Sequence, residues 1–158
     1  MHHTAKTLDP RTLACAGTTL RSAARAVSRG YDAALQRDDL TVTQFAILRR
    51  VARAGEIPMS RLADRMVMDR TTLYRALEPM TREGWIRIDP APRGRARIVR
   101  LTPAGERQLS GSTPAWESAQ TRLVEAFGVE RWQALHAELR DLTYLADRLA
   151  APGASREP

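Results

Sequence analysis

The chain has 158 residues, 43% of them hydrophobic, which suits one compact domain or a domain with an added oligomerisation element. No apolar run approaches the ~20 residues that span a bilayer, and residues 1–10 lack the apolar stretch of a signal peptide, so a cytoplasmic location is expected. The net charge of +7, almost entirely from arginine, favours an anionic partner such as nucleic acid. Cys15 is the one cysteine, which excludes an intramolecular disulfide and a cysteine-based zinc site.

The first predicted element is a long helix over residues 11–36, after a disordered N-terminus at residues 1–10. It carries a heptad-like seam of small and apolar side chains: Leu13, Gly17, Leu20, Ala24, Val27, Tyr31 and Ala34. Small seam residues allow another helix to approach closely. An ordinary amphipathic helix that packs against its own domain, without a second chain, would show the same pattern.

Three further helices follow in the order typical of a helix-turn-helix. Thr41 and Gln44 have the spacing of a capping box at the start of the first, and Gly55 ends it. A short helix opens near Pro58, and Asp69 caps the helix after it. Their apolar faces are predicted to be Phe45, Leu48, Val51 and Ala52, then Leu62, Ala63 and Met66, then Leu73, Leu77 and Met80.

Two segments with strand-like patterns, residues 85–89 and 95–101, predict a β-hairpin around a turn rich in proline and glycine. Five arginines lie along it, with Asp89 as the only nearby acid: Arg87, Arg93, Arg95, Arg97 and Arg100. Concentrated positive charge on a protruding tip suits DNA phosphates or a narrow minor groove. A hairpin placed directly after a helix-turn-helix is a wing, so residues 40–102 are predicted to form a winged DNA-binding lobe.

A long helix is expected next, with Thr102 as its cap and Pro103 at its first position, running toward Phe127. Gly111 and Pro114 interrupt its pattern and predict a kink or a break.

The last helix is predicted over residues 130–150, and a disordered tail over residues 151–158. It has one apolar stripe, made of Trp132, Leu135, Leu139, Leu142, Leu145 and Leu149. Because this stripe and the seam of the first helix need a surface to bury against, residues 11–37 and 103–150 are expected to be dimerisation helices. The fold class is therefore mainly α with a small antiparallel β-wing.

The helix capped by Asp69 is the first candidate for DNA contact. Its polar face, opposite Leu73 and Leu77, offers groups that reach base edges and phosphates from the major groove: Arg70, Thr71, Thr72, Tyr74 and Arg75. The tip arginines Arg93, Arg95 and Arg97 complete the candidate set. A merely solvated helix face is the alternative, and the basic hairpin that follows favours DNA.

The chain resembles the MarR family of winged helix-turn-helix regulators over about residues 13–149. The resemblance is carried by Leu40-Thr41 with Gln44 and Leu48, by Leu62-Ala63, by residues 69–75 and 83–86, and by Val99 with the Leu-Thr-Pro-Ala-Gly run at 101–105. It implies a homodimer, a recognition helix over residues 70–75 and a wing tip at 93–97. A dimer of this kind should bind a pseudo-palindromic duplex site. The resemblance also favours repression over activation of transcription.

The resemblance also implies an effector, a small aromatic carboxylate bound between the dimerisation helices and the DNA-binding lobe. Arg21 and Arg25 lie four residues apart beside the apolar seam and could grip its carboxylate, unless they are exposed or pair with acids of the other subunit. A second hypothesis is redox regulation through Cys15. An inert, buried cysteine is favoured over it, since Gly17 aligns with the position of the reactive cysteine in peroxide-sensing relatives.

Two other classes of protein are disfavoured. An enzyme would need a catalytic set, a metal-ligand spacing or a phosphate-binding glycine loop, and none occurs in the sequence; His136 is isolated. No cofactor or metal is expected. A winged helix used only for protein–protein contact would not need so many arginines in its wing.

Overall fold

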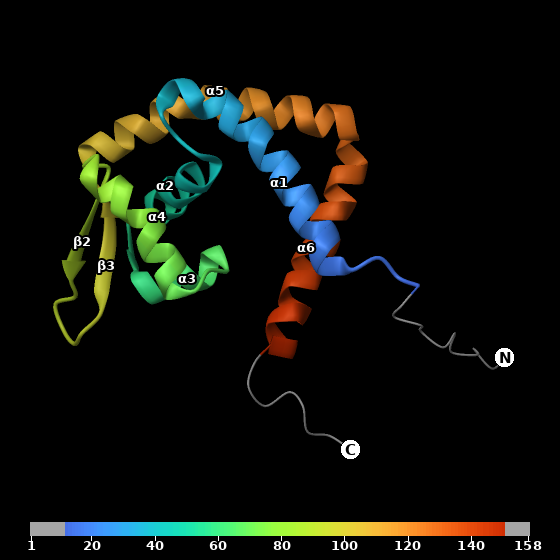
Figure 1. Ribbon diagram of the computed structural model, residues 1–158. Coiled ribbons are helices and arrows are strands. Elements are labelled where there is room, and N and C mark those ends of the chain that lie inside the picture. The colour runs from blue at the N-terminus through green and yellow to red at the C-terminus, as the bar shows by residue number, and fades with distance from the viewer. Residues whose placement is uncertain (1–11, 151–158) are drawn as a thin grey trace, which may run out of the picture. The chain divides into compact units, whose positions relative to one another are not determined.

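The computed structural model describes residues 12–150, so the expected disordered segments 1–10 and 151–158 lie outside the described residues. The described chain is mainly helical with one small antiparallel sheet, which confirms the predicted fold class (Figure 1). Its elements are α1 (Ala16–Leu35), the 3₁₀ helix η1 (Gln36–Asp38), α2 (Val42–Ala54), β1 (Glu56–Pro58), α3 (Met59–Met66), α4 (Arg70–Arg82), β2 (Ile86–Pro90), β3 (Arg97–Leu101), α5 (Pro103–Phe127) and α6 (Val129–Ala150).

The chain divides into two compact units after Trp116, within α5. The first unit contains α1 to β3 and the beginning of α5, and the second contains the rest of α5 and α6. No helix within residues 12–150 combines the length and the hydropathy of a membrane span.

The core of the first unit is built from the apolar faces of α2, α3 and α4 together with the sheet. Its fully buried members include Phe45, Leu48, Val51, Leu62, Leu73, Leu77, Met80, Ile86 and Val99. Most of the predicted core is thereby confirmed. Ala52 is an exception, since it is exposed while Ile47 is buried in its place, so the buried stripe of α2 is rotated toward Ile47.

Side-chain caps set the beginning of α2. The Gln44 amide N–H donates to Thr41 Oγ1 at 3.2 Å, and the Thr41 N–H donates to Gln44 Oε1 at 2.8 Å, which confirms the predicted capping box. Asp32 of α1 adds a contact that the sequence does not indicate, because its Oδ1 accepts from the Val42 N–H at 2.7 Å. These bonds satisfy amide donors of the first turn of α2 and join it to α1.

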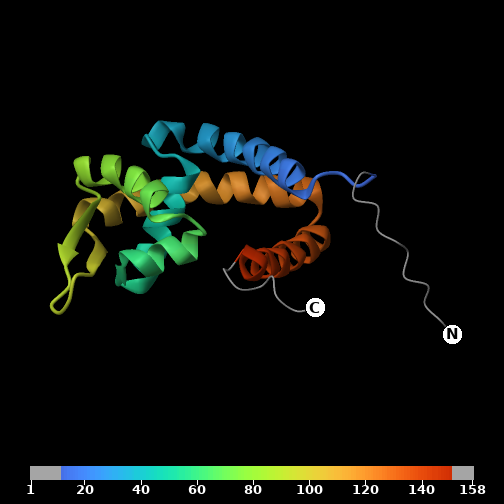
Figure 2. The same cartoon turned by 60° about the horizontal axis from the view of Figure 1, so that its bottom comes forward.

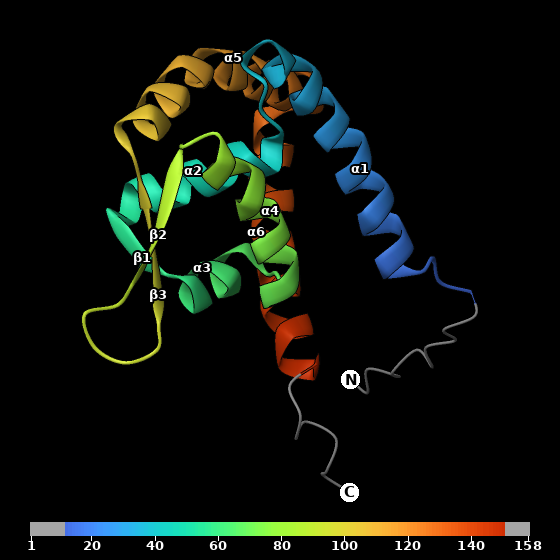
Figure 3. The same cartoon turned by 60° about the vertical axis from the view of Figure 1, so that its left-hand side comes forward.

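The sheet has three strands in the order β1-β3-β2, all antiparallel. The predicted hairpin corresponds to β2 and β3, but strand β1 was not predicted. It has only three residues, too few to show an alternating pattern, and its pairing with β3 sets Ile57 opposite Val99. The Ala91 N–H donates to the Ala96 carbonyl at 2.8 Å, so the residues between them form the tip. This tip projects beyond α3 and α4 in all three views (Figures 1, 2 and 3).

Two helices differ from the predictions. Helix α1 begins at Ala16 instead of residue 11, with Cys15 as its N-cap. The sequence predicts a kink or a break in α5 at Gly111 and Pro114; the helix is not broken there, since it runs through both residues. A proline inside a helix removes one backbone hydrogen bond, and here Ala115 and Trp116 pack against the core directly after it. Trp116 also stacks on Phe45, with ring centroids 5.4 Å apart, and this burial offsets the lost bond.

Candidate nucleic-acid interface

Helix α4 begins with a side-chain cap at Asp69. Its Oδ1 accepts from the Thr72 N–H at 2.8 Å, and its Oδ2 accepts from the Thr72 hydroxyl at 2.6 Å. The hydrogen bond from the Thr72 hydroxyl, and then that from the Thr72 N–H, lower the pKa of the Asp69 carboxyl. The cap therefore stabilises the folded protein at neutral pH, and this contribution is lost as the pH falls through the lowered pKa. Since its hydroxyl serves this cap, Thr72 is a structural residue of the helix start.

The turn between α3 and α4 is tight because Val67 adopts a left-handed conformation, with φ at 51°. Its N–H donates to the Asp64 carbonyl at 3.1 Å, which closes the end of α3. This places α4 as the second helix of a helix-turn-helix.

The outer face of α4 is polar, as predicted. Leu73 and Leu77 are fully buried, whereas the side chains on the other side are exposed: Arg70, Thr71, Tyr74 and Arg75. Arg70 and Tyr74 line a hollow of about 300 Å³ together with Arg95 and Arg97 from the hairpin. The structure thus brings two residues of each predicted set together at this hollow, while Thr71, Arg75 and Arg93 lie outside its lining.

The tip arginines Arg93, Arg95 and Arg97 are exposed. None of them makes an ion pair with a residue in the described part of the chain. We name this region the α4–wing surface, and it consists of Arg70, Thr71, Tyr74, Arg75, Arg93, Arg95 and Arg97. It has guanidinium groups for phosphates and short polar groups for base edges.

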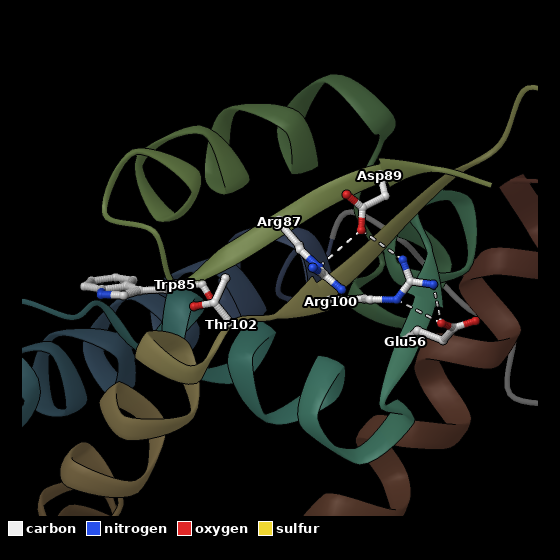
Figure 4. Close-up of polar contacts among 6 residues, drawn as sticks. All are labelled: Glu56, Trp85, Arg87, Asp89, Arg100 and Thr102. Carbon is white, nitrogen blue, oxygen red and sulfur yellow. Dashed lines mark hydrogen bonds and ion pairs between the residues drawn. The ribbon is translucent and has the colours of Figure 1, made fainter. Parts of the chain in front are cut away.

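Arg87 and Arg100 differ from the tip arginines because acids hold them in the sheet (Figure 4). Arg100 Nη1 lies 2.9 Å from Asp89 Oδ2, and Arg100 Nε donates to Glu56 Oε2 at 2.9 Å. Arg87 Nε also pairs with Asp89, at 3.2 Å. The bonds to Glu56, and then to Asp89, raise the pKa of the Arg100 guanidinium.

The expectation that Asp89 is the only acid near the hairpin is therefore wrong. Glu56 belongs to β1, whose pairing places it directly opposite Arg100. A contact between residues so far apart in the chain has no local signal in the sequence. The net positive charge of the hairpin consequently lies at its tip.

The beginning of α5 is fastened to the base of the hairpin (Figure 4). The Thr102 hydroxyl donates to the Gly84 carbonyl at 2.5 Å, and the Thr102 N–H donates to the Trp85 carbonyl at 3.0 Å. Thr102 Oγ1 also accepts from the Gly105 N–H at 3.1 Å, which confirms the predicted cap. A Cβ on Gly105 would lie only 2.0 Å from the Trp85 carbonyl oxygen, so the backbones meet here too closely for any side chain.

Two sites predicted on α1 lie on its exposed side. Arg21 and Arg25 are both exposed, and the guanidinium nitrogens of Arg21 lie 3.8 Å from the place that a Cβ on Gly17 would occupy. Cys15 is exposed, so the expectation of a buried cysteine is wrong. Hydrogen bonds from the Thr18 hydroxyl, and then from the backbone N–H groups of Thr18 and Gly17, lower the pKa of its thiol.

The apolar seams predicted for dimerisation are largely exposed within the single chain. Leu13, which precedes α1, and Leu20 and Val27 of α1 are exposed, whereas Tyr31 of the same seam is buried. Helix α6 has no buried residue, and its leucines reach exposed fractions of 53% at Leu145 and 67% at Leu149.

The comparisons with known proteins agree with this geometry. The sequence profile of the MarR family matches residues 40–93. The Mycobacterium tuberculosis transcriptional regulator MosR, in complex with DNA, is 33% identical; the match covers 87% of this chain and 100% of that chain, with a TM-score of 0.80. A probable transcriptional regulator from Pseudomonas aeruginosa is 26% identical over 80% of this chain and 96% of its own, with a TM-score of 0.72.

A mutant of Escherichia coli MarR complexed with operator DNA shares the fold, at 20% identity, 80% coverage of this chain, 91% of its own and a TM-score of 0.72. No curated protein sequence matches the chain significantly. The chain combines a helix-turn-helix with a basic hairpin, it matches the family profile over residues 40–93, and it is similar to MosR over the whole length of MosR. The chain therefore belongs to the MarR family of transcriptional regulators.

Proposed function

We propose that this protein is a homodimeric repressor that binds a pseudo-palindromic site in double-stranded DNA through the α4–wing surface. The observation that carries the proposal is the set of three tip arginines, which are exposed and make no ion pair among the described residues. Two of them, Arg95 and Arg97, share a hollow with Arg70 and Tyr74 of α4. The relatives crystallised with DNA support it. The proposed DNA-contacting residues are those of the α4–wing surface: Arg70, Thr71, Tyr74, Arg75, Arg93, Arg95 and Arg97. Thr72, whose hydroxyl serves the cap of α4, is left out of this set.

The two parts of this surface have different tasks. Helix α4 enters the major groove, where Thr71 and Tyr74 read base edges and Arg70 and Arg75 reach bases or phosphates. The tip arginines contact the backbone beside it, which contributes affinity without sequence information. Two protomers place their α4 helices in half-sites about one helical turn apart.

Thr71→Ala and Tyr74→Phe are expected to change which DNA sequence is preferred. Each removes a hydroxyl group that can hydrogen-bond to a base edge and so contribute to discrimination between bases. Selection of bound duplexes from a random library, with wild type and each variant, measures the preference. Thr121→Ala and Tyr144→Phe are matched controls at exposed positions outside the α4–wing surface. Identical selected sequences for all five proteins would refute base reading by α4, and failure of wild type to select any duplex would refute the proposed function.

We propose that the exposed seams of α1 and α6 are buried in the homodimer. An amphipathic helix such as α6, with no buried residue, needs a partner for its apolar stripe. Leu20→Glu and Leu145→Glu should therefore convert dimers into monomers or aggregates, as measured by light scattering and analytical ultracentrifugation. If these side chains remained exposed, each change would alter stability by only about 0.5 kcal/mol. A wild-type monomer, or a dimer insensitive to both changes, would contradict the proposal; Gln133→Glu is the control on α6.

We propose that a small aromatic carboxylate binds beside α1 and releases DNA. Arg21 and Arg25 supply charge next to the seam, and Gly17 leaves the space over which the Arg21 guanidinium lies. A coupling of ~1–3 kcal/mol would weaken DNA binding roughly 5- to 150-fold. The test titrates the DNA complex with benzoate and salicylate, using wild type, Arg21→Ala and Arg25→Ala, with Arg29→Ala as control. Release that is equal in all four proteins would exclude this site.

The exposure of Cys15 favours a second candidate, a repressor released by oxidation. Cys15 is exposed at a helix N-terminus, and hydrogen bonds lower the pKa of its thiol; both features favour reaction with peroxide. Peroxide should then release DNA from wild type and not from Cys15→Ser. Release by aromatic acid in both proteins, without any peroxide effect, would instead support the carboxylate effector.

A further inference from the structure

A second basic surface lies outside the α4–wing surface. The end of α2, strand β1 and the outer side of α3 enclose a groove of about 630 Å³, which we name the α3 groove. Three arginines line it, Arg53 from α2 and Arg61 and Arg65 from α3, and all three are exposed. The sequence patterns assign no role to them.

The charge of the α3 groove is more positive than its lining suggests. Two acids also line it, Glu56 and Asp64. Glu56 is held by Arg100, whose Nε donates to its Oε2 at 2.9 Å. In the described part of the chain, Arg53, Arg61 and Arg65 make no ion pair. Three guanidinium groups therefore face a single carboxylate that is not already engaged, that of Asp64.

The α3 groove and the hollow of the α4–wing surface are lined by residues that are neighbours in the sequence. Met59 and Ser60, the first residues of α3, line that hollow, whereas Pro58 and Arg61 on either side of them line the groove. The first helix of a helix-turn-helix crosses the DNA backbone while the second enters the major groove. Arg61 and Arg65 are four residues apart, so they lie on one face of α3. Their planar guanidinium groups match the geometry of phosphates.

We propose that Arg53, Arg61 and Arg65 form a phosphate-binding groove that holds the DNA backbone beside the segment read by α4. This inference rests on the proposed DNA-binding function and extends the contact surface by one further set of residues. The contacts are sequence-independent, because they reach phosphates only. An acidic protein segment would also fit the charge, but the groove lies on the first helix of the helix-turn-helix, whose first residues line the hollow of the α4–wing surface, and this position favours DNA.

The test measures how duplex affinity depends on salt, because each phosphate contact contributes about 0.9 to the slope of log K against log salt concentration. The probe is a mixed-sequence duplex of roughly 40 base pairs, about four helical turns. The full-length variants are Arg61→Gln/Arg65→Gln and Arg53→Gln, and the double change Arg61→Lys/Arg65→Lys keeps the charge. Arg107→Gln/Arg122→Gln is the matched control, since both arginines are exposed and line neither surface.

The slope should fall by about 1.8 per protomer in the double glutamine variant and by about 0.9 in Arg53→Gln. The lysine variant and the control should keep the slope of wild type. If the glutamine variants also keep it, the groove does not hold phosphates, and binding of an acidic peptide by wild type would then identify the other occupant. If wild type itself binds no duplex, the proposed function fails and this inference fails with it. Circular dichroism verifies that each variant is folded. Arg53 lies in α2, so Arg53→Gln tests the groove without any change to α3.

Discussion

Replacing Gly105 with alanine is expected to destabilise the folded protein by about 1–3 kcal/mol, the usual cost of forcing extra atoms into a closely packed site. The added Cβ would lie 2.0 Å from the carbonyl oxygen of Trp85, which is backbone and can move only if the start of α5 separates from the hairpin. The result is opposite to the helix propensities, since alanine is favoured over glycine inside a helix by about 1 kcal/mol. Thermal and urea unfolding of the two proteins measure the difference.

Gly111→Ala is the matched control for this prediction. Gly111 lies in the same helix, and a Cβ there would meet nothing within 4 Å. This change should therefore raise stability by up to about 1 kcal/mol. If both alanine variants were more stable than wild type, the close approach of α5 to Trp85 would be wrong. A destabilised Gly105→Ala protein should also bind DNA less tightly, because the same contact fastens the base of the wing.

Removal of the three tip arginines is expected to have the largest effect on DNA binding. Arg93→Gln/Arg95→Gln/Arg97→Gln should weaken duplex affinity by at least roughly a hundredfold near physiological salt, and should lower the salt slope by about 2.7 per protomer. The reason is that these arginines are exposed and are not engaged by acids in residues 12–150, whereas Arg87 and Arg100 are. Sequence preference should change little, because phosphate contacts carry no base information.

The control for the wing is a second triple change with the same loss of charge, Arg107→Gln/Arg122→Gln/Arg140→Gln, at exposed positions of α5 and α6. It separates contact by the tip from a general effect of net charge. Fluorescence anisotropy at several salt concentrations gives both affinity and slope. Equal losses in the two triple variants would mean that the wing is not a DNA-contacting element.

The sequence by itself determined the local structure of the winged lobe and the order of its elements, apart from β1. Capping residues at Thr41, Asp69 and Thr102 lie within one turn of the amides they bind, so their spacing alone predicts where α2, α4 and α5 begin. Helical periodicity likewise separated the buried Leu73 and Leu77 from the exposed face of α4. The predicted α4 and tip residues follow from this local information.

Only the tertiary structure decided the features that depend on contacts between residues distant from one another in the chain. Strand β1 is too short for a pattern and exists through its pairing with β3. This pairing also brings Glu56 to Arg100 and offsets the charge of that arginine at the base of the hairpin. The continuity of α5 through Pro114 depends on the burial of the residues after it, and the need for glycine at position 105 depends on the backbone of Trp85. In each case the deciding energy is packing or pairing between segments, which propensity and spacing within one segment do not contain.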